Sequence, residues 1–103
     1  MSIAELPILL DREILEQFCR ARGIRRLSLF GSVLRGDFDP ARSDVDVLIE
    51  YLPGRIPGFD FIGHQSELAQ VFGTKVDLNT PRCLSKFFRE KAVNEALPIY
   101  EQA

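Results

Sequence analysis

The sequence predicts a small α/β domain, in which helices flank a mixed β-sheet. Patterns with helical spacing alternate along the chain with short β-branched runs, in the order helix, strand, short helix, strand, helix, strand, helix, strand. The 103 residues suffice for one modest core, so residues 1–103 are expected to form a single domain. The short connection between the first two strands allows either strand sense, so the sheet need not be all parallel.

Composition and charge narrow the class of protein. The chain is 46% hydrophobic and 27% charged with a net charge of -2, which is ordinary for a globular protein and predicts no direct nucleic-acid binding. No signal peptide is recognisable and no run approaches the roughly 20 apolar residues of a membrane span, so no membrane association is expected. Cys19 and Cys83 lack metal-type spacing, which favours a reduced, cytoplasmic protein.

The first helix and strand are expected at 11–22 and 25–30. Asp11 is a suitable N-cap and Gly23 a suitable C-terminal stop. This part of the chain is rich in arginine, with Arg12, Arg20, Arg22, Arg25 and Arg26. These arginines are expected to form either a solvated helix face or a docking surface for an acidic partner.

The middle of the chain carries turn signals around a second strand. A short helix from Gly31 to about Leu34 is ended by Gly36, and a polar turn with a proline follows at 37–42. The apolar run at 44–51 predicts the second strand, and the two prolines and two glycines of 52–58 predict a mobile loop near the site described below.

The second half is expected to hold two helices and two strands. Their predicted ranges are a helix at 60–72 capped by Asp60 and ended by Gly73, a strand at 74–79, a helix at 86–96 capped by Ser85, and an edge strand at 97–100. His64 is expected on the polar surface of its helix. Phe87, Phe88 and Val93 are expected among the apolar positions of the last helix.

Three aspartates are predicted to share one face of the sheet. Side chains alternate along a strand, so Asp44 and Asp46 lie on one face and Val45 and Val47 on the other. If the 74–79 strand pairs beside this one, Asp77 joins the same face. Clustered carboxylates are unfavourable unless a cation compensates them, and Mg²⁺ is the usual cation at phosphate chemistry.

Gly31-Ser32 is predicted to bind phosphate. A strand that runs into Gly-Ser and then a helix leaves backbone N–H groups free, and such groups bind phosphate. Arg35 is a candidate to bind phosphate bidentately, or to pair with Asp37 or Asp39 and brace the turn.

These residues resemble a known family. Gly31-Ser32, Arg35-Gly36, the run Ser43-Asp44-Val45-Asp46 and the downstream Asp77 resemble the minimal nucleotidyltransferases of the DNA polymerase beta superfamily. The resemblance implies the nucleotidyltransferase fold, ATP as substrate, and a nucleotide held by Gly31, Ser32, Arg35 and Ser43.

The resemblance also implies roles for the aspartates and a partner. Asp44, Asp46 and Asp77 would be the catalytic residues and the ligands of Mg²⁺, with two ions expected. Members this short resemble the antitoxin of a toxin–antitoxin pair, which implies transfer of AMP from ATP to a tyrosine of a HEPN-type ribonuclease toxin. Two alternatives stay open: a non-catalytic antitoxin that neutralises its partner by binding it, and a nucleotidyltransferase acting on small molecules.

Overall fold

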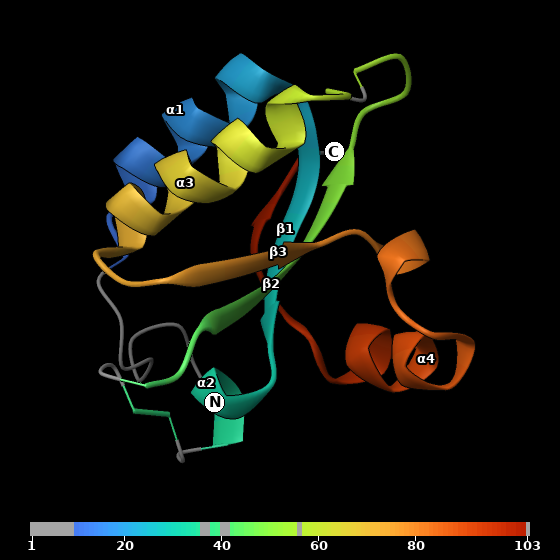
Figure 1. Ribbon diagram of the computed structural model, residues 1–103. Coiled ribbons are helices and arrows are strands. Elements are labelled where there is room, and N and C mark those ends of the chain that lie inside the picture. The colour runs from blue at the N-terminus through green and yellow to red at the C-terminus, as the bar shows by residue number, and fades with distance from the viewer. Residues whose placement is uncertain (1–9, 36–37, 40–41, 56, 103) are drawn as a thin grey trace.

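A mixed four-stranded sheet with helices on both faces forms the domain in a computed structural model that describes residues 10–35, 38–39, 42–55 and 57–102 (Figure 1). The strands lie in the order β3-β2-β1-β4. β1 is antiparallel to both of its neighbours, whereas β2 and β3 run parallel. The strands are β1 (Ile24–Phe30), β2 (Val45–Tyr51), β3 (Val76–Asn79) and β4 (Leu97–Glu101). The predicted α/β class with a mixed sheet is confirmed.

The helices are divided between the two faces of the sheet. Figure 1 shows α1 (Arg12–Arg22) and α3 (Asp60–Phe72) side by side, away from the small α2 (Ser32–Arg35) and from α4 (Lys86–Glu95). A single 3₁₀ turn, η2 (Pro81–Cys83), which the sequence analysis did not predict, separates β3 from α4. Each predicted helix and strand exists within two residues of its predicted bounds at either end. None of the helices in the described part of the chain has the length and apolar character needed to cross a membrane.

The main core lies between the sheet and the helix pair α1 and α3. Alternate strand residues face this core, and they include Val45, Val47, Ile49, Val76 and Leu78, all buried. The helices meet them with Leu15, Phe18, Cys19, Leu68 and Phe72. Burial of each large apolar side chain contributes about 1.5–3 kcal/mol, which makes this face the main source of stability.

The first helix has the predicted caps at both ends. The helix α3 begins at Asp60 as predicted, but Asp60 is not its N-cap. Asp11 accepts a hydrogen bond from the N–H of Ile14 at 3.1 Å, and Gly23 ends α1 with φ of 68°. Asp60 is the first residue of α3, and Phe59 stands at the N-cap without a side-chain bond. The chain enters this helix through a turn in which Asp60 N–H bonds the Pro57 carbonyl and Phe61 N–H bonds that of Gly58, so no side-chain cap is used.

His64 is buried, and the prediction of a surface histidine is wrong. It lies four residues before Leu68 and eight before Phe72, so all three share the inward stripe of α3. Its Nδ1 lies 2.8 Å from the Tyr51 hydroxyl. Burial raises the pKa of Tyr51 to about 12, so this hydroxyl stays protonated at neutral pH and can pair with either tautomer of the ring. A histidine whose ring nitrogen is satisfied in this way can occupy a core position.

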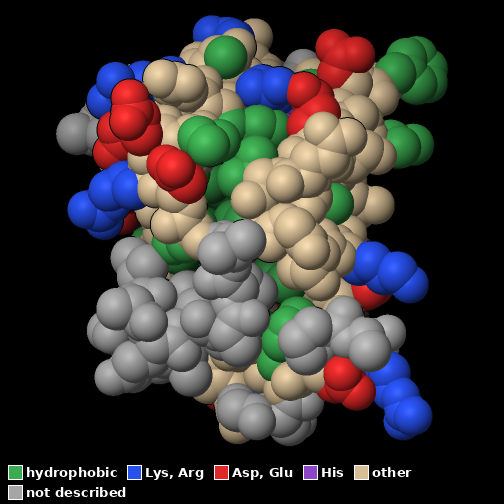
Figure 2. Space-filling view, turned by 90° about the vertical axis from the view of Figure 1, so that its left-hand side faces the viewer, with side chains coloured by type: hydrophobic (Ala, Val, Ile, Leu, Met, Phe, Trp, Pro, Cys, Tyr) green, Lys and Arg blue, Asp and Glu red, His purple; other side chains and the backbone are tan. Residues whose placement is uncertain are grey.

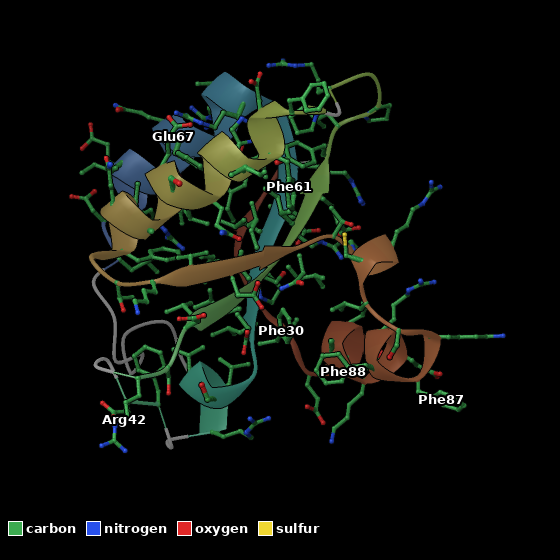
Figure 3. The ribbon with its side chains drawn as sticks, in the orientation of Figure 1. Phe30, Arg42, Phe61, Glu67, Phe87 and Phe88 are labelled. Atoms are coloured by element: carbon green, nitrogen blue, oxygen red, sulfur yellow. The ribbon has the colours of Figure 1, made fainter. Side chains whose placement is uncertain are left out.

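The last helix buries little, contrary to the prediction from its apolar residues. Ala92 is the only buried residue of α4, and it packs with Phe30 and Leu48 on the sheet face opposite the main core. Phe87 is 94% exposed and Val93 is also exposed. Phe88 contacts Phe30 edge-to-face with ring centroids 6.1 Å apart, while Phe87 points away from the sheet (Figure 3). Within the described residues, the helix packs on this face at Phe30 and Leu48.

Three of the five N-terminal arginines form ion pairs with acidic residues of the same chain. Arg22 pairs with Glu67 and stacks over the Phe18 ring, 4.0 Å from its centroid. Arg25 and Arg26 lie on β1 and pair with Glu50 at 3.7 and 3.5 Å. These pairs leave less unpaired positive charge on this surface, and its role in docking stays a prediction. Charged side chains of both signs are interspersed over the surface seen in Figure 2.

The stability of the fold should fall when the pH drops below about 6.5, because of His64. Burial, followed by the nearby Arg22, lowers the pKa of His64 from 6.5, although Glu67 and Asp60 oppose this. The unfolded chain then binds the proton more readily than the folded one, so acid favours unfolding. We expect the urea midpoint of the wild type to fall from pH 7.5 to pH 5 more than that of His64→Gln, which cannot titrate. Parallel pH profiles for the two proteins would contradict this assignment.

Candidate active site

Two of the predicted aspartates are direct neighbours across the parallel strands. Asp46 of β2 pairs in register with Asp77 of β3, so both carboxylates leave the sheet on the face opposite Val45 and Leu78. Asp44 comes immediately before β2 and is exposed. The strand alternation predicted this shared face for Asp46 and Asp77, and the register shows it.

The carboxylates form a field that disfavours charge on Asp46. Burial raises the pKa of Asp46, and the negative charges of Asp77 and Asp44 raise it further. The positive charge of Arg35 acts in the opposite direction. Asp46 thus lies within electrostatic reach of both other aspartates and of Arg35, and the site carries more negative than positive charge.

Gly31 lies directly against the carboxylate of Asp46. It follows the last residue of β1, Phe30, which pairs with Asp46 in the antiparallel ladder. Its φ is 79°, and a Cβ added there would overlap Oδ2 of Asp46. The N–H of Leu34 bonds the Gly31 carbonyl at 3.0 Å, which starts α2. Only glycine therefore satisfies both the backbone angle and the close approach of this carboxylate.

The residues between α2 and β2 brace their own loop. The Asp39 N–H donates to Oγ of Ser43 at 3.1 Å, and the Ser43 N–H donates to the Asp39 carbonyl at 2.7 Å. Ser43 therefore shapes the approach to Asp44, and its predicted contact with a nucleotide stays a prediction. Asp37, one of the two acidic partners proposed for Arg35, lies outside the described residues, as does Gly36.

The donor set of this site fits a hard divalent cation. Asp44, Asp46 and Asp77 offer only carboxylate oxygens, which are ligands preferred by Mg²⁺. Burial, followed by the negative charges of Asp77 and Asp44, raises the pKa of Asp46. Within the described residues, no three acidic, histidine or cysteine side chains lie close enough together to hold a metal as they stand. The backbone places these carboxylates as neighbours, and side-chain rotation has to complete a metal site.

The prediction that the loop at 52–58 lies near these carboxylates is wrong for its described residues. It follows the far end of β2, where the Leu52 N–H bonds the Gly23 carbonyl at the start of β1. The seven residues of β2 separate it from Asp44 by roughly 20 Å. The order of the residues already implies this distance, because the loop follows the end of the 44–51 strand opposite to the end that carries Asp44 and Asp46.

Two side chains that fix β3 were missed. Oε1 of Gln65 on α3 accepts from the Leu78 N–H at 3.0 Å, and Nδ2 of Asn79 donates to the Asp77 carbonyl at 3.1 Å. No sequence pattern indicates the first contact, since it joins residues of different elements. The second is a local contact over two residues, which a side-chain amide at a strand end makes readily.

Comparison with known proteins agrees with this geometry. Residues 11–100 match the family model described as the nucleotidyltransferase domain. The chain belongs to the nucleotidyltransferase domain family. A curated relative, a putative protein adenylyltransferase of Methanocaldococcus jannaschii, is 31% identical over 77 residues, covering 75% of this chain and 81% of the relative. The chain is a nucleotidyltransferase by family and by these relatives.

Solved structures of nucleotidyltransferases have the same fold. One described as a putative minimal nucleotidyltransferase superposes with a TM-score of 0.69 at 33% identity, covering 84% of this chain and 87% of that one. A toxin–antitoxin structure with AMP-PNP gives 0.70 at 19% identity, covering 90% and 75%. A complex of a tri-AMPylated Shewanella oneidensis HEPN toxin with its MNT antitoxin gives 0.61 at 17%, covering 88% and 70%. The last two identities show likeness of fold alone.

Gly31→Ala should disturb this nucleotidyltransferase more than Gly54→Ala does. Both glycines have φ of 79°, so both substitutions carry the same strain of about 1–2 kcal/mol. An added methyl group at Gly54 meets no atom within 4 Å, whereas at Gly31 it displaces the Asp46 carboxylate. We expect nucleotidyl transfer to be lost only in Gly31→Ala, as measured by release of pyrophosphate. Equal activity in the two variants would show that Gly31 does not fix Asp46.

Asp46→Asn should not destabilise the metal-free protein. The raised pKa of Asp46 means that its ionised form opposes folding, and this cost grows as the pH rises above the usual range of an aspartate. We expect the thermal midpoint at pH 7.5 without divalent ions to be equal to or above that of the wild type. Glu90→Gln, on the exposed surface of α4, is the control. A clear fall of the midpoint in Asp46→Asn alone would make Asp46 a structural residue.

Proposed function

We propose that this nucleotidyltransferase transfers AMP from ATP to a tyrosine hydroxyl of a protein partner, a HEPN-type ribonuclease toxin, and acts as its antitoxin. The observation that carries the proposal is the register of β2 and β3, which sets Asp46 beside Asp77 and next to Gly31. Such an arrangement serves a reaction in which a phosphate group passes between two oxygen atoms under a cluster of carboxylates.

The residues of the chain suit an in-line displacement. The acceptor oxygen attacks the α-phosphorus of ATP, the bond from that phosphorus to the bridging oxygen breaks, and pyrophosphate leaves. Asp77 would take the proton of the acceptor hydroxyl. The Ser32 hydroxyl and the backbone at Gly31 would hold the β- and γ-phosphates, and Arg35 would add a positive charge on the same side.

Mg²⁺ is the proposed metal, on Asp44, Asp46 and Asp77. When bound, it would neutralise phosphate charge and favour the ionised form of the attacking hydroxyl. Without it, the carboxylates oppose the approach of a triphosphate, since Asp46 already carries repulsion from Asp77 and Asp44. The same repulsion would make the site receptive to the cation.

The choice of a protein acceptor rests on the relatives. The curated relative at 31% identity is named for protein adenylylation, and an antitoxin of the same fold is found with an AMPylated HEPN toxin. The Asp77 side chain is exposed and that of Asp46 is half-buried, so a folded surface that carries the acceptor would have access to them. Neither alternative, a purely binding antitoxin or an enzyme acting on small molecules, has an observation of its own in its favour.

The transfer should be visible as a mass gain. We expect the product of the neighbouring gene, incubated with this chain, ATP and Mg²⁺, to gain the mass of one or more AMP groups on tyrosine. Asp77→Asn should lower the rate by about 100-fold or more, because it removes the proposed base. Glu90→Gln is the control and should react like the wild type. A partner that stays unmodified, yet loses ribonuclease activity on binding either Asp77→Asn or the wild type, would establish the binding antitoxin instead.

A further inference from the structure

The strand that carries Asp77 is short and lies at the edge of the sheet. β3 has four residues, and β2 is its only partner among the described strands. The Val45 N–H bonds the Lys75 carbonyl at 2.8 Å, so the backbone groups of Lys75 and Asp77 point toward β2. Those of Leu78 point the other way, toward the free edge. An edge strand this short needs a second support to keep its side chains in place.

Gln65 supplies that support from α3, which runs alongside β3 (Figure 1). Its Oε1 accepts the outward Leu78 N–H at 3.0 Å. The helix itself is anchored on both sides of Gln65, because His64 and Leu68 are buried in the core. Gln65 is half-buried, so water competes poorly for this bond.

The bond acts on the residue next to Asp77. The Leu78 side chain is buried in the main core, its N–H is held by Gln65, and Asp77 projects to the opposite face, in register with Asp46. Gln65 therefore contributes to a backbone position from which the Asp77 carboxylate reaches its neighbour. It lies on the helix side of the sheet and does not share the face of the carboxylates.

We propose that Gln65 is a positioning residue for Asp77, acting through the Leu78 N–H. The inference rests on the proposed function, in which Asp77 meets the acceptor hydroxyl. Loss of the bond would leave the Leu78 N–H unsatisfied and let β3 shift along its free edge. A shift of about 1 Å at a reacting group can lower a rate by two orders of magnitude. The effect falls on kcat, because the residues proposed to bind the triphosphate, Gly31, Ser32 and Arg35, lie after β1 and in α2 and not on β3.

Three variants of the full chain separate this role from general destabilisation. Gln65→Met keeps the length of the side chain and removes the strong acceptor. Gln65→Glu replaces the amide by a carboxylate, whose oxygen can accept the same bond. Gln70→Met makes the same change at an exposed position of the same helix. Exchange of the Leu78 amide hydrogen measured by NMR reads the bond directly, with the Val47 amide as an internal reference.

We expect Gln65→Met to speed exchange at Leu78 by roughly 10-fold without affecting Val47. Its kcat should fall about 10-fold or more at unchanged KM for ATP, and its Mn²⁺ affinity, measured by calorimetry without nucleotide, should fall as well. Gln65→Glu and Gln70→Met should match the wild type. Unchanged Leu78 exchange in Gln65→Met would overturn the proposal. So would faster exchange that leaves kcat and Mn²⁺ affinity unchanged, or an equal loss in Gln70→Met.

The same experiment distinguishes failure of this inference from failure of the proposed function. If the wild type transfers no AMP to its partner, the proposed function fails. The exchange of the Leu78 amide hydrogen and the affinity for Mn²⁺ then test the positioning role of Gln65 by themselves. Weaker Mn²⁺ binding together with faster exchange in Gln65→Met would still assign the positioning role, and unchanged Mn²⁺ binding would remove it.

Discussion

The parallel pairing of β2 with β3 is the constraint on which the rest of the site depends. It is the one parallel contact in a sheet whose other described pairs are antiparallel, and it sets Asp46 against Asp77. A shift of β3 by one residue would turn Asp77 into the core and bring Leu78 out to the open face. The buried Val76 and Leu78 oppose such a shift, so the packing that stabilises the fold also fixes the carboxylates.

The two faces of the sheet have different tasks. One face is closed by α1 and α3 and contains the main core, whereas the other is covered at one end by α4 through Ala92. Charge repulsion between aspartates is tolerated on the second face because the first supplies most of the apolar burial. Burial, followed by the charges of Asp77 and Asp44, raises the pKa of Asp46, and Gly31 lies close against the same carboxylate. The nucleotidyltransferase thus holds an arrangement that would suit a bound cation better than it suits the free protein.

The hydrogen bonds that support the site come from residues outside the aspartate cluster. Gln65 holds the outer edge of β3, and Ser43 with Asp39 holds the chain just before β2. Arg89 of α4 donates to the Pro81 carbonyl at 2.6 Å and to that of Leu84 at 3.2 Å, which fixes the segment that follows β3. Together these bonds hold the segment before β2, the outer edge of β3 and the segment after β3. The site is therefore held by the short segments around the sheet as well as by its ladder.

The sequence by itself determined the order of the elements, the caps Asp11 and Ser85, and the alternation that sets Asp46 and Asp77 opposite their apolar neighbours, because these follow from local periodicity and turn chemistry. The pairing of β2 with β3, which brings the two carboxylates together, is tertiary. Tertiary structure alone decided the rest. His64 is buried because Tyr51, distant in sequence, offers a hydroxyl to its ring nitrogen, and Phe87 is exposed because α4 reaches the sheet through Ala92. Contacts of this kind depend on how elements meet in space, which the spacing of residues along one element does not contain.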